Sequence, residues 1–332
     1  MVSNNPAVAS GPLLRPGTSA AARLVSVSPD TRRRLQLVLA AIWLLDGVLQ
    51  YQSFMFSRGF SQMLASVAPG NPAVIADPIT WAAKIVAQHP VPTNAAFATI
   101  QLLLGLGIAC RRTVRPALAA SIVWAVAVWW FGEGLGGILN GGASPVNGAP
   151  GAVIIYALLA VLLWPVADGD RSGQPEFVAA RPVGAVAAKV LWLVLWGSLA
   201  YFAVIAANRT AQGLHDMVAG MASGEPGWVG AINRGAADTL AHHGLEASIV
   251  LAILLGAIAV GVFLPLPLSR AAVVLAVVIS LLIWVVGQDL GGILAGGATD
   301  PNSGLLLALL AAAYWPASAV ARRSPDPTEA QA

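Results

Sequence analysis

The chain has 332 residues, of which 57% are hydrophobic and only 10% are charged, and its formal net charge is +3. Because soluble domains carry about 25% charged residues, most of the surface of this chain is suited to lipid rather than to water. The single cysteine, Cys110, excludes an intramolecular disulfide and any metal or iron–sulfur site that needs several cysteines. All but two of the 18 basic residues are Arg, and with the abundant Ala and Gly this indicates GC-rich codon usage, which favours a bacterial plasma membrane.

Residues 1–32 are mostly small and polar and include several prolines. They show no basic start followed by a short apolar core and a cleavage site, so they do not resemble a secretory signal. We predict a disordered cytoplasmic tail for 1–32 and a second cytoplasmic tail for 322–332. Between them, the sequence predicts two membrane units, 33–165 and 186–321, joined by a cytoplasmic linker over 166–185.

Eight apolar stretches are candidates to cross a bilayer, given about 20 residues per helical crossing. Two of them are short, and we expect the adjoining Gly-rich segments to supply the missing length. The fold is therefore predicted to be all-α, a polytopic membrane protein with eight transmembrane helices in two tandem four-helix repeats. The predicted spans cover residues 35–56, 94–110, 116–131, 152–165, 186–206, 247–264, 271–286 and 305–321.

Basic residues fall unevenly between the two sides that these spans define. Of the 18, only Arg58, Lys84, Arg209 and Arg234 lie on the side opposite the two termini. Because Lys and Arg are enriched in cytoplasmic loops, we predict a multi-pass protein of the plasma (inner) membrane with both termini in the cytoplasm. The lipid bilayer is then its main partner, and nothing in the sequence indicates nucleic-acid binding.

The two long external loops, 57–93 and 208–244, carry apolar residues beside tryptophans such as Trp81 and Trp228. This pattern is typical of short amphipathic helices anchored at the membrane interface. A lid over a binding site is the alternative role for these loops.

The sequence repeats itself with a period near 155 residues. The segment Gly132-Glu-Gly-Leu-Gly-Gly-Ile-Leu-Asn-Gly-Gly-Ala143 recurs as Gly287-Gln-Asp-Leu-Gly-Gly-Ile-Leu-Ala-Gly-Gly-Ala298. Such a duplication, with four spans in each half, predicts parallel repeats related by an axis along the membrane normal. A site on that axis would be lined by both copies.

The Gly-rich segments have two alternative roles. Gly137 and Gly141, like Gly292 and Gly296, have the spacing that lets membrane helices pack closely. Alternatively, the backbone leaves the helix there and lines a cavity, since irregular backbone at membrane depth must be covered by protein or face water. The residues predicted to line such a cavity are Gly136, Gly137, Asn147, Gln288, Gly291, Gly292 and Asn302.

Three carboxyl groups are candidates for catalytic proton transfer. Asp46 lies in the middle of the first span, whereas Glu133 and Asp289 stand near the start of the two Gly-rich segments. An ionisable side chain at membrane depth is costly and therefore indicates a functional site. The alternatives are a structural hydrogen bond, for Asp46 through Gln101 of the second span, and a hydrated interfacial position for Glu133 and Asp289.

His89 and His243 occupy matching positions at the ends of the external loops, which makes them candidates for binding a cofactor. Gln101 and Trp130 are further candidates, Trp130 through stacking on a quinone ring. A metal site is not predicted, because it needs three or four converging ligands, and no nucleophile–base pair is visible. Interfacial or capping roles are the alternative for the histidines, and packing for the tryptophan.

The segment Gln101-Leu-Leu-Leu-Gly-Leu-Gly-Ile-Ala-Cys-Arg-Arg-Thr-Val-Arg-Pro-Ala-Leu118 resembles the second span and basic turn of DoxX/DoxD-type membrane proteins. Ser269-Arg-Ala-Ala-Val-Val-Leu275 is similar to the same turn in the second half, and Asp46-Gly47-Val-Leu-Gln50 falls where that family has a Gly and a polar residue. The resemblance covers each four-helix half. It implies association with redox partners and, for some members, thiosulfate oxidation coupled to quinone.

The resulting hypothesis is a redox-associated membrane subunit that handles a quinone or a small sulfur compound, at most one subunit of a membrane oxidoreductase with a separate redox partner subunit. The cofactor that this hypothesis suggests is a quinone. A transporter or channel for a small solute along the axis between the repeats is the first alternative, and a structural or assembly factor is the second.

Overall fold

The computed structural model describes four stretches of the chain, residues 28–166, 176–205, 207–222 and 224–316. These residues form helices and no β-strand, in agreement with the predicted all-α fold. The predicted tails lie outside the described residues, except that α1 (Ser28–Leu49) already begins within 1–32. The described part of the predicted linker contains one short helix, α7 (Ala180–Val183).

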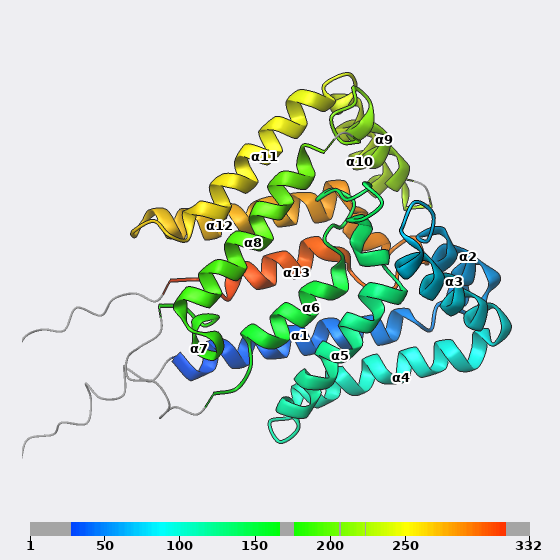
Figure 1. The fold of residues 1–332 in the computed structure, drawn as a ribbon, viewed down its shortest axis with the longest axis horizontal. Helices are drawn as coiled ribbons and strands as arrows, with labels where there is room; N and C mark the ends of the chain where they lie inside the picture. Colours follow the sequence, from blue (N-terminus) through cyan, green and yellow to red (C-terminus); the bar gives the residue numbers. More distant parts are fainter. Residues whose placement is uncertain (1–27, 167–175, 206, 223, 317–332) are drawn as a thin grey trace, which may run out of the picture.

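In the first half of the chain, four helices run along the molecule, and shorter helices lie at one of their ends (Figure 1). α1 packs along α4 (Pro90–Ala109), and α5 (Val114–Phe131) packs along α6 (Ala152–Leu162). α3 also contacts α4 and α5, so the loop after α1 forms a cover over the helix ends. This cover consists of η2 (Ser53–Phe56), α2 (Arg58–Ser66) and α3 (Ala73–Gln88).

The second half has the same order of helices. α8 (Ala185–Ala203) packs along α11 (Gly244–Gly261), and the helix that begins with α12 (Leu268–Leu282) packs along α13 (Asn302–Ala312). Both long loops contain short helices, as predicted, and both sets lie toward the same end of the molecule (Figure 1). In the second half these helices are α9 (Gly213–Met221) and α10 (Gly227–Leu240).

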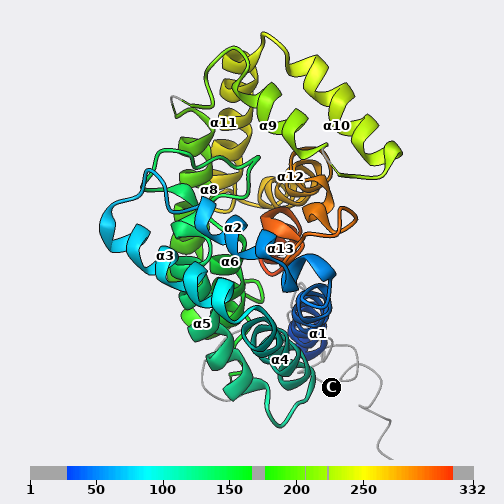
Figure 2. The same cartoon turned by 90° about the vertical axis from the view of Figure 1, so that its right-hand side faces the viewer.

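The two halves meet where α6 contacts α13, near the middle of the molecule (Figure 2). The buried core around this contact contains large rings that are almost inaccessible, namely Trp43, Tyr156, Trp192, Trp196 and Tyr314. Large apolar side chains also cover the outside, as at Val123 and Val186, which are 72% and 79% exposed. An apolar exterior of this extent is suited to lipid, so the structure is consistent with an integral membrane protein.

Five described helices are long and apolar enough to cross a membrane, namely Pro90–Ala109, Val114–Phe131, Ala185–Ala203, Gly244–Gly261 and Leu268–Gly287. The last of these joins α12 to the π-helical turn η4 (Ile283–Gly287). α6 and α13 are apolar but have 11 residues each, about half of what a crossing needs. α1 has 22 residues but contains several charged ones. The eight predicted spans are thus supported for five helices.

The two Gly-rich segments are not continuous helices. Each forms a short 3-10 turn, η3 (Gly134–Gly137) or η5 (Asp289–Gly292). Inside each turn a Leu and the following Gly have positive φ, 57° and 65° in the first turn, 55° and 77° in the second. The backbone therefore leaves the helix here, and the alternative of two closely packed helices at these segments is wrong.

Matching hydrogen bonds stabilise the two turns. Trp129 Nε1 donates to the carbonyl oxygen of Pro150 at 2.7 Å, and Trp284 Nε1 donates to that of Pro301 at 2.8 Å. The backbone that returns toward α6 or α13 is thereby fixed against the end of the preceding helix.

Gly136 should be intolerant of any side chain. Its φ is +65°, and a Cβ atom there would lie 2.1 Å from the carbonyl oxygen of Pro150. We expect Gly136→Ala to lower the thermal unfolding midpoint of the purified protein, because it combines a clash with a backbone cost of about 1–3 kcal/mol. Gly197→Ala is the control, since a Cβ there meets nothing within 4 Å. Equal midpoints for the two variants would contradict this geometry.

Candidate functional site

A cavity of about 330 Å³ lies among α1, α4 and α5, against the cover formed by α2 and α3. Its volume falls within the range of small-molecule pockets, roughly 300–1,000 Å³. Phe60, Met63 and Leu64 of α2 and Trp81 of α3 contribute to its wall, so the loop helices close over it. Residues 299 and 300 of the second half also line it, which places the cavity where the two halves adjoin.

Aromatic rings make up much of the cavity wall. Within α5, Trp124, Val128 and Phe131 lie on one face because residues four and seven apart return to the same side of a helix. Phe97 and Trp124 have ring centroids 5.6 Å apart, and Trp81 and Phe131 are 6.2 Å apart. The six rings that line the cavity are Trp43, Phe60, Trp81, Phe97, Trp124 and Phe131.

Asp46 lines the cavity from α1 and is 1% exposed. Its Oδ2 accepts a 2.5 Å hydrogen bond from the hydroxyl of Tyr156 on α6, whereas its Oδ1 is buried with no partner among the described residues. The predicted structural partner of Asp46 was Gln101, and the structure gives Tyr156 instead. One oxygen of Asp46 therefore remains available to a ligand.

Glu133 follows α5 and also lines the cavity. Its Oε1 accepts a hydrogen bond from the backbone N–H of Val153 at 3.2 Å, while its Oε2 is buried without a partner in the described part of the chain. This buried position differs from the hydrated interfacial position that was the alternative for Glu133. Like Asp46, Glu133 accepts a hydrogen bond with one carboxyl oxygen, and its other carboxyl oxygen has no partner among the described residues.

Three further polar groups of the cavity wall lack partners. The side-chain oxygens of Gln50 and Gln101 and the indole Nε1 of Trp124 are buried, and within the described residues none has a hydrogen bond. The cavity therefore offers hydrogen-bond acceptors at several points and a donor at Trp124. Buried polar groups in folded proteins are normally satisfied, so these groups are available to a polar molecule in the cavity.

Asp300 is a third acid of the cavity, which the sequence did not single out. Its oxygens accept hydrogen bonds from the Thr299 hydroxyl at 2.8 Å and from the backbone N–H of Asn302 at 2.7 Å. It reaches the cavity from the segment before α13, in the other half of the chain. No local pattern indicates that contact, because it depends on how the halves pack.

The cavity carries acidic groups without a basic counterpart. None of the described residues that line it is Lys, Arg or His. Burial, followed by repulsion from Asp300, raises the pKa of Glu133 to about 8. Burial also raises the pKa of Asp300. A carboxyl group with such a pKa exchanges its proton near neutral pH, which suits it to proton transfer.

The structure places the other predicted site residues outside this cavity. Trp130 lies on another face of α5, where its Nε1 donates to the carbonyl oxygen of Val74 at 3.2 Å. Asp289 and Gln288 lie in the second half, and Gln288 is satisfied by bonds within the fold. The remaining residues absent from the cavity wall are Gly136, Gly137, Asn147, Gly291, Gly292 and Asn302.

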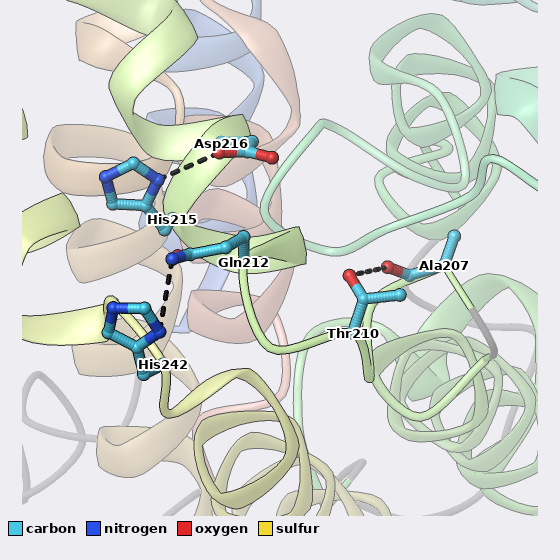
Figure 3. Close-up of polar contacts among 6 residues, drawn as sticks. All are labelled: Ala207, Thr210, Gln212, His215, Asp216 and His242. Atoms are coloured by element: carbon cyan, nitrogen blue, oxygen red, sulfur yellow. Dashed lines mark hydrogen bonds and ion pairs between the residues drawn. The ribbon is translucent and has the colours of Figure 1, made fainter.

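The histidines are also outside the cavity. His89 lies between α3 and α4, and His243 directly precedes α11. On the second loop, His215 pairs with Asp216 at 2.9 Å and His242 faces Gln212 at 3.3 Å (Figure 3). The described residues contain no group of three or more His, Cys, Asp or Glu placed to hold a metal ion. His89 and His243 stand at the N-cap positions of α4 and α11, but neither side chain makes a capping hydrogen bond.

No protein-family model, no curated protein and no solved structure matches this chain. The resemblance to DoxX/DoxD-type proteins therefore stays a prediction from the quoted residues. The geometry of the cavity is what supports a functional proposal.

The raised pKa of Glu133 makes stability depend on pH. From its ordinary value of 4.5 up to about 8, the folded protein holds a proton that the unfolded chain releases. The free energy of unfolding therefore falls as pH rises through this window and levels off above it. We expect the unfolding midpoint of Glu133→Gln to fall less across this window than that of the unmodified protein.

The control for this measurement is Glu246→Gln, at an exposed position near the start of α11. It should keep the pH profile of the unmodified protein. Identical profiles for Glu133→Gln and the unmodified protein would show that Glu133 does not stay protonated in the fold.

Proposed function

We propose that this integral membrane protein binds the headgroup of a quinol or quinone in the cavity, as the membrane subunit of a redox system. The observation that carries the proposal is the set of unsatisfied buried polar groups among six aromatic rings. A hydroxylated ring matches both features, because its face packs on aromatic side chains and its hydroxyls donate hydrogen bonds. A small sulfur compound has no aromatic face that could pack on these rings.

Each redox form of the headgroup finds a partner in the cavity. The hydroxyls of a quinol would donate to Asp46 Oδ1 and Glu133 Oε2, the two free carboxyl oxygens. The carbonyl oxygen of a quinone would accept from Trp124 Nε1. Because the carboxyl oxygens are buried, a hydrogen bond formed there is stronger than it would be in water.

The chain's own contribution to the reaction would be proton transfer. Oxidation of a quinol to a quinone releases two protons and two electrons. We propose that Asp46 and Glu133 accept the protons from the hydroxyls, Glu133 only in its ionised form, which its pKa of about 8 makes accessible slightly above neutral pH. The electrons would pass to a separate redox partner protein.

We further propose the membrane arrangement that the sequence predicts. The helices would form eight crossings in two tandem repeats, with α6 and α13 completed by the Gly-rich turns. The matching Trp–Pro hydrogen bonds at 129–150 and 284–301 support a duplication. The uneven distribution of Lys and Arg supports cytoplasmic termini in a plasma membrane, so the α2–α3 cover would face outward.

Transport of a small lipophilic cation is the second candidate. It is favoured by one observation, the presence of three carboxyl groups in a cavity whose described lining residues include no basic side chain. A positive charge would be attracted both by the carboxylates and by the faces of the aromatic rings.

Quinol binding can be measured through the tryptophans of the cavity. We expect a short-chain ubiquinol to quench the intrinsic fluorescence of the purified protein in detergent, because Trp43, Trp81 and Trp124 line the site. Asp46→Asn and Glu133→Gln should each weaken binding by roughly tenfold, the loss of one hydrogen bond to a buried carboxyl group. Trp124→Phe keeps an aromatic ring but removes the N–H donor, so it should weaken the binding of quinone more than the binding of quinol.

The control variant is Glu225→Gln, an acid of the second loop that does not line the cavity. It should bind quinol as the unmodified protein does. Unchanged quinol affinity in the Asp46 and Glu133 variants would overturn the proposal and leave a structural role for these acids. Saturable binding of tetraphenylphosphonium but not of quinol, abolished by Asp46→Asn, would support the transport candidate instead.

A further inference from the structure

We propose that Glu225, Asn233 and Asp289 form a binding site for a hard divalent cation, with Ca²⁺ the best match. Glu225 lies two residues before α10, Asn233 lies on α10, and Asp289 lies in the turn η5. The carboxyl groups of Glu225 and Asp289 lie within hydrogen-bond reach of each other, and the Asn233 side chain lies beside Asp289. The site is separate from the cavity of the first half.

The oxygen atoms of this site are buried and have no hydrogen-bond partner of normal geometry among the described residues. They comprise both carboxyl oxygens of Glu225 and of Asp289 and the amide oxygen of Asn233. Asp289 is 1% exposed and Asn233 is 0% exposed. Asn233 Nδ2 donates to the carbonyl oxygen of Val286 at 3.1 Å, which fixes the amide and leaves its oxygen available.

The first half of the chain shows that this convergence follows from the fold. Asp289 aligns with Gly134, and the loop positions of Glu225 and Asn233 align with Asn71 and Ile79. A Cβ atom at Gly134 would lie 3.3 Å from Asn71 Nδ2 and 3.4 Å from Ile79 Cδ1. The same three positions therefore lie together in both halves. In the first half they hold uncharged residues, and in the second half they hold two carboxyl groups and an amide.

A cation satisfies this set better than a protein donor would. Hard cations such as Ca²⁺ bind carboxylate and amide oxygens, typically six to eight of them including waters. Glu225 is partly exposed, so the site lies near the surface, where water could enter with the ion. Among the described residues, the backbone N–H of Ala295 lies near Glu225 and lowers its pKa.

The two carboxyl groups lie close enough to affect each other's pKa. Burial and the neighbouring Asp289 raise the pKa of Glu225 to about 7. The pKa of Asp289 is also raised, chiefly by burial. No Lys or Arg of the described chain contributes to either shift.

Calcium binding can be tested on the full chain in detergent with CaCl₂, MgCl₂ and NaCl. We expect Ca²⁺ to raise the unfolding midpoint in a concentration-dependent way, because a ligand that binds only the folded state stabilises it. Calorimetric titration should give one ion per chain. Glu225→Gln and Asp289→Asn should each weaken binding roughly tenfold or more, and Asn tolerates the positive φ of position 289.

Glu133→Gln is the matched control, because it removes an acid of the other half and should keep the Ca²⁺ response. A midpoint that does not respond to Ca²⁺ or Mg²⁺, or a response that survives in both second-half variants, would overturn the proposal. A midpoint that ignores cations but loses its pH dependence near neutrality in Glu225→Gln would also overturn it, in favour of a proton shared by the two acids. These outcomes do not depend on whether the cavity of the first half binds quinol.

Discussion

A backbone in lipid must satisfy its own hydrogen bonds, and this chain leaves the helical conformation at two points that have to be covered. Polar side chains gather at both. Trp129 and Trp284 donate to carbonyl oxygens of the returning backbone, while Glu133 and Gln288 accept N–H groups from the first turns of α6 and α13. The positions of the polar groups thus follow from the breaks in the helices, and so do the sites built from them.

Glu133 and Gln288 occupy matching positions in the two halves but differ in how fully the protein satisfies their side chains. Gln288 accepts from the backbone with its oxygen, and its Nε2 donates to Ser303 Oγ at 2.8 Å, so nothing remains for a ligand. Glu133 accepts the corresponding bond with Oε1, but its Oε2 has no protein partner in the described chain and lies at the cavity. The amide of Gln288 makes hydrogen bonds with both its oxygen and its nitrogen, whereas the carboxyl group of Glu133 keeps one oxygen without a partner in the described chain.

Composition and periodicity were sufficient to predict an all-helical chain with apolar helices, since these depend on local sequence, whereas they left open whether the Gly-rich segments are helical or broken. The cavity wall was harder to predict. Trp124 and Trp130 are six residues apart on α5, about 240° around the helix at 100° per residue, so only one of them faces the cavity. The sequence does not state which face meets α1 and α4. Tyr156 and Asp300 were missed for the same reason, because their partners are distant in the chain.

The surroundings of the two acidic sites determine what each can bind. Asp46 and Glu133 lie among aromatic rings, so their carboxyl groups would be matched by hydrogen-bond donors on an apolar molecule. Glu225 is partly exposed, which places the second acidic pair near the surface, where a hard cation would keep water as part of its coordination shell. Two groups of the same chemical type, on two halves with the same order of helices, would therefore be directed to different ligands by the residues around them.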